Sequence, residues 1–125
     1  DWSSDVCSSD LTIVGRQLDA YNARDIDAFM ACWADDAEIY QFPLTLLAKG
    51  ADAIRARHVT RFQEADLHGA LIARMRMGGY VVDREQVTRN LPEGKARIEV
   101  TAIYEVADGR VAKAWFLNGE TTPLG

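Results

Sequence analysis

The sequence predicts a single α+β domain, with helices packed on one face of a curved and mostly antiparallel sheet. Apolar residues recur at helical spacing in the first half of the chain, whereas they alternate with period two over most of residues 71–117. The turn sequences Pro92-Glu93-Gly94 and Asp108-Gly109 divide that second half into antiparallel strands. A length of 125 residues is typical of one domain.

The first half supplies three helices and one or two short strands. Asp25 or Asp27 can cap the second helix, because a short side-chain oxygen accepts hydrogen bonds from the unpaired amides of a helix N-terminus. Asp35-Asp36 ends that helix, and Pro43 stops the following strand because proline cannot donate a ladder hydrogen bond. We expect helices over residues 12–23, 26–34 and 51–65, and strands over residues 37–42 and 44–47.

The second half supplies the rest of the sheet, and no repeat or linker interrupts it. Gly78-Gly79 makes a turn or a bulge after its first strand. That first strand alternates an apolar face, which includes Met75 and Met77, with a face that includes Arg74 and Arg76. We expect strands over residues 71–77, 80–89, 96–106 and 111–117.

The segment from Asp1 to Leu11 differs from the rest of the chain. It has four serines, three aspartates and no basic residue, and its apolar residues follow neither period. The string resembles the read-through translation of a sequencing adapter, in which case the natural N-terminus is missing. The alternative is a natural flexible tail whose Ser9 or Asp10 caps the first helix. We expect a leader at residues 1–11, one domain at residues 12–120 and a tail at residues 121–125.

Charge and composition exclude several classes of partner. The chain has 14 basic and 19 acidic residues; without the leader, 16 acidic residues remain and the net charge is −2 rather than −5. It has no basic patch for nucleic acid or an anionic membrane, and no apolar run near the roughly 20 residues that cross a bilayer. His58, His68 and Cys32 lack metal-ligand spacing, so we expect no metal and no other cofactor. One cysteine in the domain is typical of the cytoplasm.

Four motifs in this order resemble the nuclear transport factor 2-like superfamily, which implies a cone-shaped fold over residues 16–119. They are Tyr21-Asn22-Ala23-Arg24-Asp25-Ile26-Asp27-Ala28-Phe29, Trp33-Ala34-Asp35-Asp36-Ala37-Glu38-Ile39, Lys49-Gly50-Ala51-Asp52-Ala53-Ile54 and Ile103-Tyr104-Glu105-Val106-Ala107-Asp108-Gly109-Arg110-Val111. Residues 79–88 and 102–106 further resemble a bacterial SnoaL-like group that is labelled steroid isomerase-like by analogy. A shared fold does not imply a shared reaction.

The resemblance allows the isomerase catalytic positions to be compared with this chain. Ketosteroid isomerases use an aspartate base near the end of the first strand, an oxyanion tyrosine on the first helix and a neutral carboxylic acid on a late strand. The matching positions here are Gln41, Gln17 and Ala102 or its neighbour. A glutamine amide has no accessible protonation state near neutral pH, so we expect no steroid isomerisation by that mechanism.

A pocket is still expected inside the cone. His58 matches the place of a pocket tyrosine in the isomerases and is the candidate catalytic residue, because histidine transfers protons near neutral pH. The alternative is a histidine that is hydrogen-bonded at the edge of the core. Amides such as Gln41 either bond among themselves or meet a ligand. The predicted pocket residues are Gln17, Tyr21, Trp33, Gln41, Phe62, Phe116 and Asn118.

The acidic residues of the late strands are expected to form ion pairs rather than to catalyse. Asp83 and Glu85 share one strand face, and the resemblance sends Glu99 and Glu105 to the outer face of the sheet, where cross-strand charge pairs are the simpler account. The outer face also carries Trp115 with Ile103. We therefore expect a homodimer that forms through this face.

Two functions follow. The first is a small-molecule-binding protein, with acid–base chemistry of isomerase, cyclase or lyase type on a hydrophobic carbonyl compound; His58 shuttles the proton. The second is a non-catalytic binding or assembly module that uses the sheet face. A cavity of about 300 Å³ or more at His58 and Gln41 favours the first function. A cone filled by Trp33, Phe62, Met75 and Phe116 favours the second.

Overall fold

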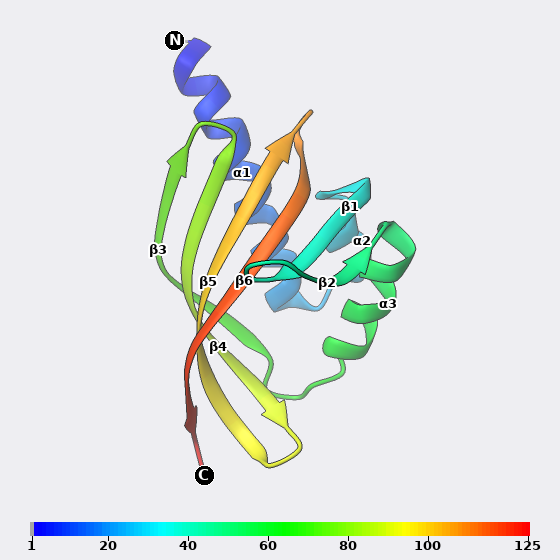
Figure 1. The fold of residues 1–125 in the computed structure, drawn as a ribbon, viewed down its shortest axis with the longest axis vertical. Coiled ribbons are helices and arrows are strands. Elements are labelled where there is room, and N and C mark those ends of the chain that lie inside the picture. The colour runs from blue at the N-terminus through cyan, green and yellow to red at the C-terminus, as the bar shows by residue number, and fades with distance from the viewer. Residues whose placement is uncertain (1) are drawn as a thin grey trace.

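A computed structural model describes residues 2–125, with side chains from residue 10 onward, and it combines three helices with one six-stranded sheet (Figure 1). The helices are α1 (Trp2–Ala23), α2 (Ile26–Met30) and α3 (Ala51–Arg61). The strands are β1 (Trp33–Gln41), β2 (Thr45–Lys49), β3 (His68–Met77), β4 (Tyr80–Leu91), β5 (Gly94–Ala107) and β6 (Arg110–Pro123). No helix among the described residues has both the length and the apolar character needed to cross a lipid bilayer.

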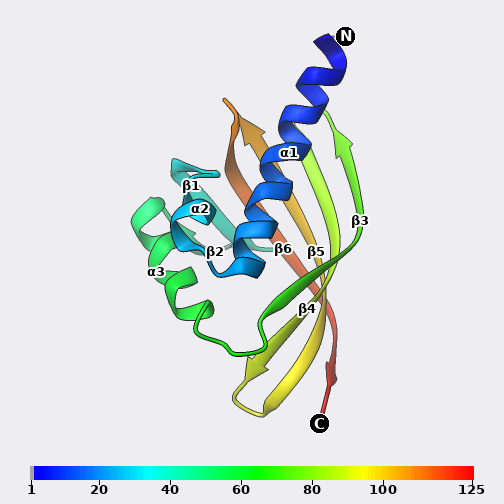
Figure 2. The ribbon, with the colours of Figure 1, turned by 180° about the vertical axis from the view of Figure 1, so that it is seen from behind.

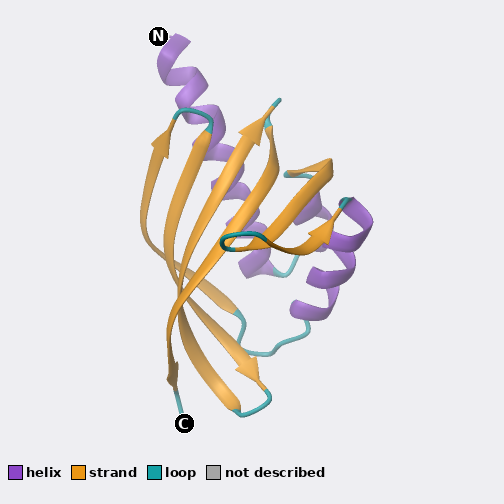
Figure 3. Cartoon of the chain, in the orientation of Figure 1, coloured by secondary structure: helices purple, strands orange, loops and turns teal. Residues whose placement is uncertain are grey.

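The strands follow the order β2-β1-β6-β5-β4-β3, and only β1 and β6 run parallel. The long strands β4, β5 and β6 twist strongly and curve around the helices (Figure 3). All three helices lie on the same side of the sheet, with α1 across the long strands and α2 and α3 beside β1 and β2 (Figure 2). The predicted α+β class and curved, mostly antiparallel sheet are confirmed.

The second helix is shorter than predicted. Asp25 caps α2 by accepting a hydrogen bond from the Ala28 amide at 3.1 Å, but the helix ends at Met30 rather than at residue 34. The amide of Val111 donates to the Cys32 carbonyl at 2.8 Å, and β1 then begins at Trp33. Pairing with β6 supplies the backbone partners that a longer helix would have used. Similarly, α3 ends at Arg61 rather than at residue 65.

Both ends of the chain continue regular structure past the predicted boundaries. α1 begins at Trp2 rather than at residue 12, and its first turns extend beyond the end of β3 (Figure 1). Leu11 packs against the hydrophobic core, while Asp1 lies outside the described residues. At the other end, residues 121–123 pair with β5 as part of β6. The origin of residues 1–11 stays a prediction.

The sheet face that meets the helices is mostly apolar. Val81 and Val87 of β4 and Ala102 and Tyr104 of β5 are buried there, as alternation along each strand requires. In β3 the faces are the reverse of what the apolar pattern suggests. Met75 is 54% exposed on the outer face, so it does not fill the cone.

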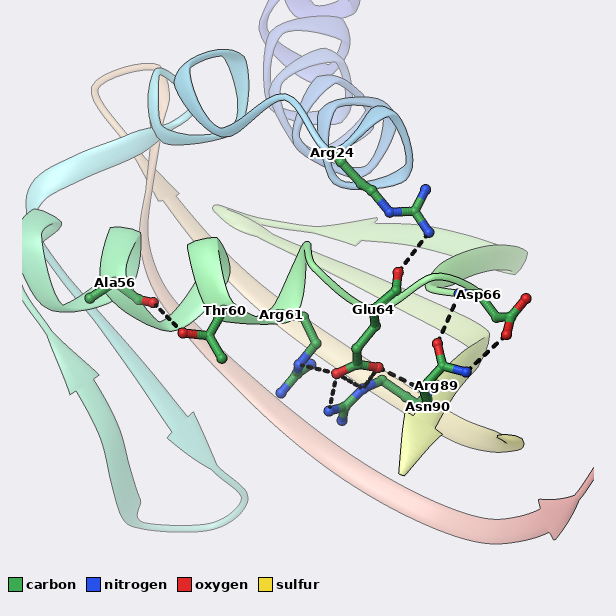
Figure 4. Close-up of polar contacts among 8 residues, drawn as sticks. All are labelled: Arg24, Ala56, Thr60, Arg61, Glu64, Asp66, Arg89 and Asn90. Atoms are coloured by element: carbon green, nitrogen blue, oxygen red, sulfur yellow. Dashed lines mark hydrogen bonds and ion pairs between the residues drawn. The ribbon is translucent and has the colours of Figure 1, made fainter. Parts of the chain in front are cut away.

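Two contacts fix the end of α1 against the start of β3. The Asn22 side chain donates to the Gly69 carbonyl at 2.9 Å and accepts from the Gly69 amide at 2.8 Å. Arg24 donates to the carbonyl of Glu64 at 2.9 Å (Figure 4). It also donates to the carbonyls of Ala65 and Leu67 at 2.9 and 3.2 Å. Because these partners are 40 or more residues from Arg24 in sequence, they hold α1, α3 and the sheet in a fixed arrangement around the space between them.

Candidate functional site

A cavity of about 110 Å³ lies between the helices and the inner face of the sheet. It is smaller than the roughly 300 Å³ at which pockets for drug-sized ligands begin, so it suits a compact molecule. The cone is therefore not filled, but its cavity is smaller than the roughly 300 Å³ that would favour the small-molecule-binding function. Of the predicted residues, Gln17, Tyr21, Trp33, Gln41, His58, Phe116 and Asn118 line the cavity.

Phe62 is the predicted pocket residue that is not among those lining the cavity. It is buried, and its ring packs edge-on against Tyr21 and Phe29, with both centroid separations 5.5 Å. Phe62 follows directly after the last residue of α3, so its ring closes the space behind Tyr21 instead of facing inward. Phe62 therefore lies one layer behind the lining residues, where its side chain supports the cavity wall without forming its surface.

His58 is buried among aromatic rings. The Phe29 ring centroid lies 4.5 Å away, and the Phe62 and Tyr21 centroids lie at 5.9 and 6.3 Å. Loss of water lowers the pKa of His58 to about 4, with a smaller effect from Arg61 and Arg57. Its Nδ1 lies 2.8 Å from the Ile54 carbonyl, which can only accept, so Nδ1 carries the proton. At neutral pH, Nε2 is therefore a hydrogen-bond acceptor on an uncharged ring.

Glu85 of β4 lines the same cavity and is only 6% exposed. Burial raises the pKa of its carboxyl group to about 7, helped by the nearby charge of Asp83 and opposed by Arg74. Its Oε2 is buried with no hydrogen-bond partner among the described residues. Space for the side chain depends on Gly69, where a Cβ atom would approach Glu85 Oε1 to 3.3 Å. The carboxyl group is thus poised to gain or lose a proton near neutral pH.

Asp83, two residues before Glu85, has a different environment on the same face. It is completely buried, and Arg74 of β3 binds both of its oxygens, with Nε and Nη2 at 2.6 and 2.8 Å. This contact holds the pKa of Arg74 above its usual value. A buried pair with two hydrogen bonds is well compensated. Asp83 is therefore held in an ion pair beside Glu85.

A hydrogen-bonding pair, Gln17 and Tyr104, also lines the cavity. The Gln17 amide donates from Nε2 to the Tyr104 hydroxyl oxygen at 3.1 Å, and both side chains are buried. Burial, together with the charges of Glu85 and Asp83, raises the pKa of Tyr104 far above its usual value, so the hydroxyl keeps its proton as a donor. Gln17 and Gln41 both line the cavity, but the side-chain partner of Gln17 is Tyr104.

The remaining wall of the cavity is basic. Arg57 and Arg61 of α3 and Arg89 of β4 line it. Glu64 accepts hydrogen bonds from Arg89 Nε at 2.9 and 3.1 Å and from Nη2 at 2.7 Å, and its Oε2 lies 3.7 Å from Arg61 Nε (Figure 4). Arg89 is half-buried and contributes to the site.

The structure adds Glu85, Tyr104 and these arginines to the residues expected from sequence. Glu85 had a detectable signal, because it follows Val81 and precedes Val87 in the same strand phase, and both valines are apolar core residues. A charged residue in that phase must be buried. Arg89 lies in the same strand phase and had the same signal. Arg57 and Arg61 had none, since their position on α3 matches that of a solvated helix face. No cluster of three or more potential metal ligands occurs in the described part of the chain.

The fold and the site together define a class of protein, in which a curved sheet is closed by helices around an internal cavity with aromatic and titratable walls. Residues 14–114 match the SnoaL-like domain family, and the chain belongs to that family. Its fold is that of the nuclear transport factor 2-like superfamily, as the resemblance predicted. No protein of curated function matches the sequence.

Solved structures share the fold at low sequence identity. An uncharacterized cystatin-fold protein from Novosphingobium aromaticivorans is 24% identical over 86% of this chain and 96% of its own, with a TM-score of 0.78. An LEH-like epoxide hydrolase from M. tuberculosis is 15% identical over 90% of this chain and 84% of its own, with a TM-score of 0.79. An NTF2-like protein of unknown function from Cytophaga hutchinsonii is 11% identical over 88% and 89%, with a TM-score of 0.73.

Proposed function

We propose that the cavity is a catalytic site for acid–base chemistry on a small carbonyl compound, with Glu85 as the residue that moves the proton. The observation that carries the proposal is a carboxyl group that is 6% exposed, faces a cavity and has a pKa of about 7. A general base works best when its pKa lies near the working pH. His58, the residue favoured by sequence, is a weaker base because its pKa is about 4.

The other polar groups have complementary roles in this proposal. In its ionised form, Glu85 takes a proton from the carbon beside the carbonyl group, and negative charge develops on the carbonyl oxygen. The Tyr104 hydroxyl, held by Gln17 at 3.1 Å, donates to that oxygen. His58 Nε2 orients the substrate by accepting a hydrogen bond. Proton return from Glu85 to a different carbon completes an isomerisation, and a ring closure or elimination can begin from the same intermediate.

The experiment is proton–deuterium exchange, followed by NMR, at the carbon next to the carbonyl in a panel of small ketones and enones. We expect Glu85→Gln to slow exchange by at least about 100-fold, because general acid–base catalysis contributes roughly 10²–10⁴-fold. Glu99→Gln removes the same charge from the exposed outer face and should leave the rate unchanged. Full exchange by Glu85→Gln would exclude Glu85 as the base.

A second candidate function is assembly through the outer face of the sheet. Five side chains form a lateral row across five strands, here named the outer row: Met75, Val82, Ile103, Trp115 and Tyr40. Tyr40 and Trp115 stack at 6.0 Å with an interplanar angle of 14°. An apolar row of this extent is typical of a protein interface, and we infer a second copy of the chain as its partner. If assembly were the sole function, the exchange experiment would show no acceleration.

A further inference from the structure

The basic wall of the cavity has more positive than negative charge. Three arginines line it, and two of them, Arg61 and Arg89, pair with one carboxylate, that of Glu64. Arg89 donates hydrogen bonds to both carboxylate oxygens of Glu64, whereas Arg61 Nε lies 3.7 Å from Glu64 Oε2. Arg57 has no acidic partner within the described part of the chain. The groups that perturb Arg57 most are burial and the charges of Arg61 and Arg89, all of which lower its pKa.

An unpaired guanidinium in this position is costly without a partner. Arg57 is half-buried and lies beside two like charges, so both desolvation and repulsion act against it. The attraction and hydrogen bonds of a bound anion would offset both penalties. A guanidinium matches a carboxylate in particular, because its parallel N–H groups meet the two oxygens in a planar arrangement.

The basic wall and Glu85 lie apart in the cavity. Glu85 and Arg89 both line it from the same face of β4, and they are four residues apart, which is about 13 Å along a strand. The walls between them are aromatic, and they include Phe29, Trp33, Tyr104 and Phe116. A ligand that spans this space has an anionic group at one end and an apolar body.

We propose, on the premise that the cavity of the proposed function binds a ligand, that this ligand is a small organic anion whose carboxylate pairs with Arg57. The arrangement places the carboxylate at the basic wall and the apolar body along the aromatic residues, with the reacting carbon toward Glu85. Arg61 supports the pair as a second cation. The substrate class is therefore narrowed from a hydrophobic carbonyl compound to a carbonyl compound that also carries an acid group.

The experiment measures binding rather than turnover, with benzoate and its neutral isostere benzamide as the probes. Calorimetric titration at pH 7 and low salt should give roughly 10- to 100-fold tighter binding of benzoate, the range for a charged hydrogen-bonding pair. Arg57→Gln should remove that preference, and Arg57→Lys should keep part of it because the charge remains. The matched control is Arg55→Gln on the same helix, where Arg55 pairs with Asp27 at 3.0 Å and does not line the cavity.

The outcomes separate this proposal from the catalytic one. Equal binding of the two probes by the unmodified protein, no binding of either, or an unchanged preference in Arg57→Gln would each overturn the anion site. Perturbed NMR signals of Trp33 and Tyr104 on benzoate addition should locate the probe in the cavity, and shifts confined to other residues would overturn the assignment. Glu85→Gln should keep the benzoate preference, so loss of exchange activity in that variant does not contradict the anion site. Likewise, loss of the benzoate preference in Arg57→Gln does not contradict the role of Glu85 in exchange.

Discussion

The two faces of the sheet differ in the environment of their charged side chains, which are buried on the inner face and exposed on the outer face. On the inner face, Asp83 and Glu85 are buried, one in a short pair with Arg74 and the other with an unpartnered oxygen. On the outer face, Arg84 and Glu99 pair at 3.7 Å with side chains that are 66% and 49% exposed. The residues of the two pairs are neighbours on β3, β4 and β5. They differ mainly in their access to water.

This difference is the reason for placing the proposed chemistry on the inner face. Water screens the exposed pair, so its contribution to stability is small. Without water, the inner groups depend on their neighbours, and Glu85 has one acidic neighbour and no hydrogen bond to Oε2. The outer face instead carries aromatic and aliphatic side chains, and its charged residues form ion pairs. Glu38, for example, lies near both Lys49 and Lys113.

The largest expected effect comes from removing one partner of each pair. Arg74→Met leaves Asp83 buried without a counter-charge and should lower the free energy of unfolding by about 3 kcal/mol or more. Arg84→Met breaks the exposed pair and should change it by less than about 1 kcal/mol. Urea denaturation of both variants at pH 7 measures the contrast. Similar losses in the two variants would mean that burial does not separate the two faces in energy.

The next effect concerns pH. Between pH 4.5 and about 7, Glu85 is ionised in the unfolded chain but protonated in the folded protein, so stability falls as pH rises. Between about pH 4 and 6.5, His58 is protonated only in the unfolded chain, so its contribution rises with pH. Relative to the unmodified protein, Glu85→Gln should gain about 3 kcal/mol of stability between pH 4 and pH 8, because each pKa unit corresponds to 1.36 kcal/mol.

The matched variant for this measurement is His58→Gln. It should show the opposite change, gaining stability relative to the unmodified protein as pH falls from 6.5 to 4. Urea denaturation at half-unit pH intervals gives both curves. If Glu85→Gln ran parallel to the unmodified protein across this range, the raised pKa of Glu85 would be wrong, and with it the reason for choosing Glu85 over His58.

The smallest expected effect tests the outer row. Trp115→Ala should raise the dimer dissociation constant about 30-fold, which corresponds to the roughly 2 kcal/mol of an interface hot spot. Sedimentation equilibrium measures it, with Val59→Ala on α3 as the control, because Val59 is 43% exposed and lies on a helix rather than in the outer row. A protein that remains monomeric at high concentration would refute the dimer.

The sequence predicted most elements of the fold because their periodicity is a local property. It overextended the second helix, because residues 31–34 satisfy helical spacing while their backbone partners come from β6, which lies 75 or more residues later. It also found most of the aromatic and amide residues of the cavity through the family resemblance. It chose His58 over Glu85 because residue type favours histidine near pH 7, and only burial reverses that order.

The sequence by itself determined the alternation that divides each strand between two faces, the turns that order the strands and the family to which the chain belongs. The tertiary structure decided which face loses water, and that choice fixed the chemistry. Asp83 and Glu85 have the same charge and the same strand phase, but only Asp83 meets Arg74 in a short pair. Protonation depends on solvation and on neighbours distant in sequence, so Glu85 could be proposed as the proton-transferring group only from the folded structure.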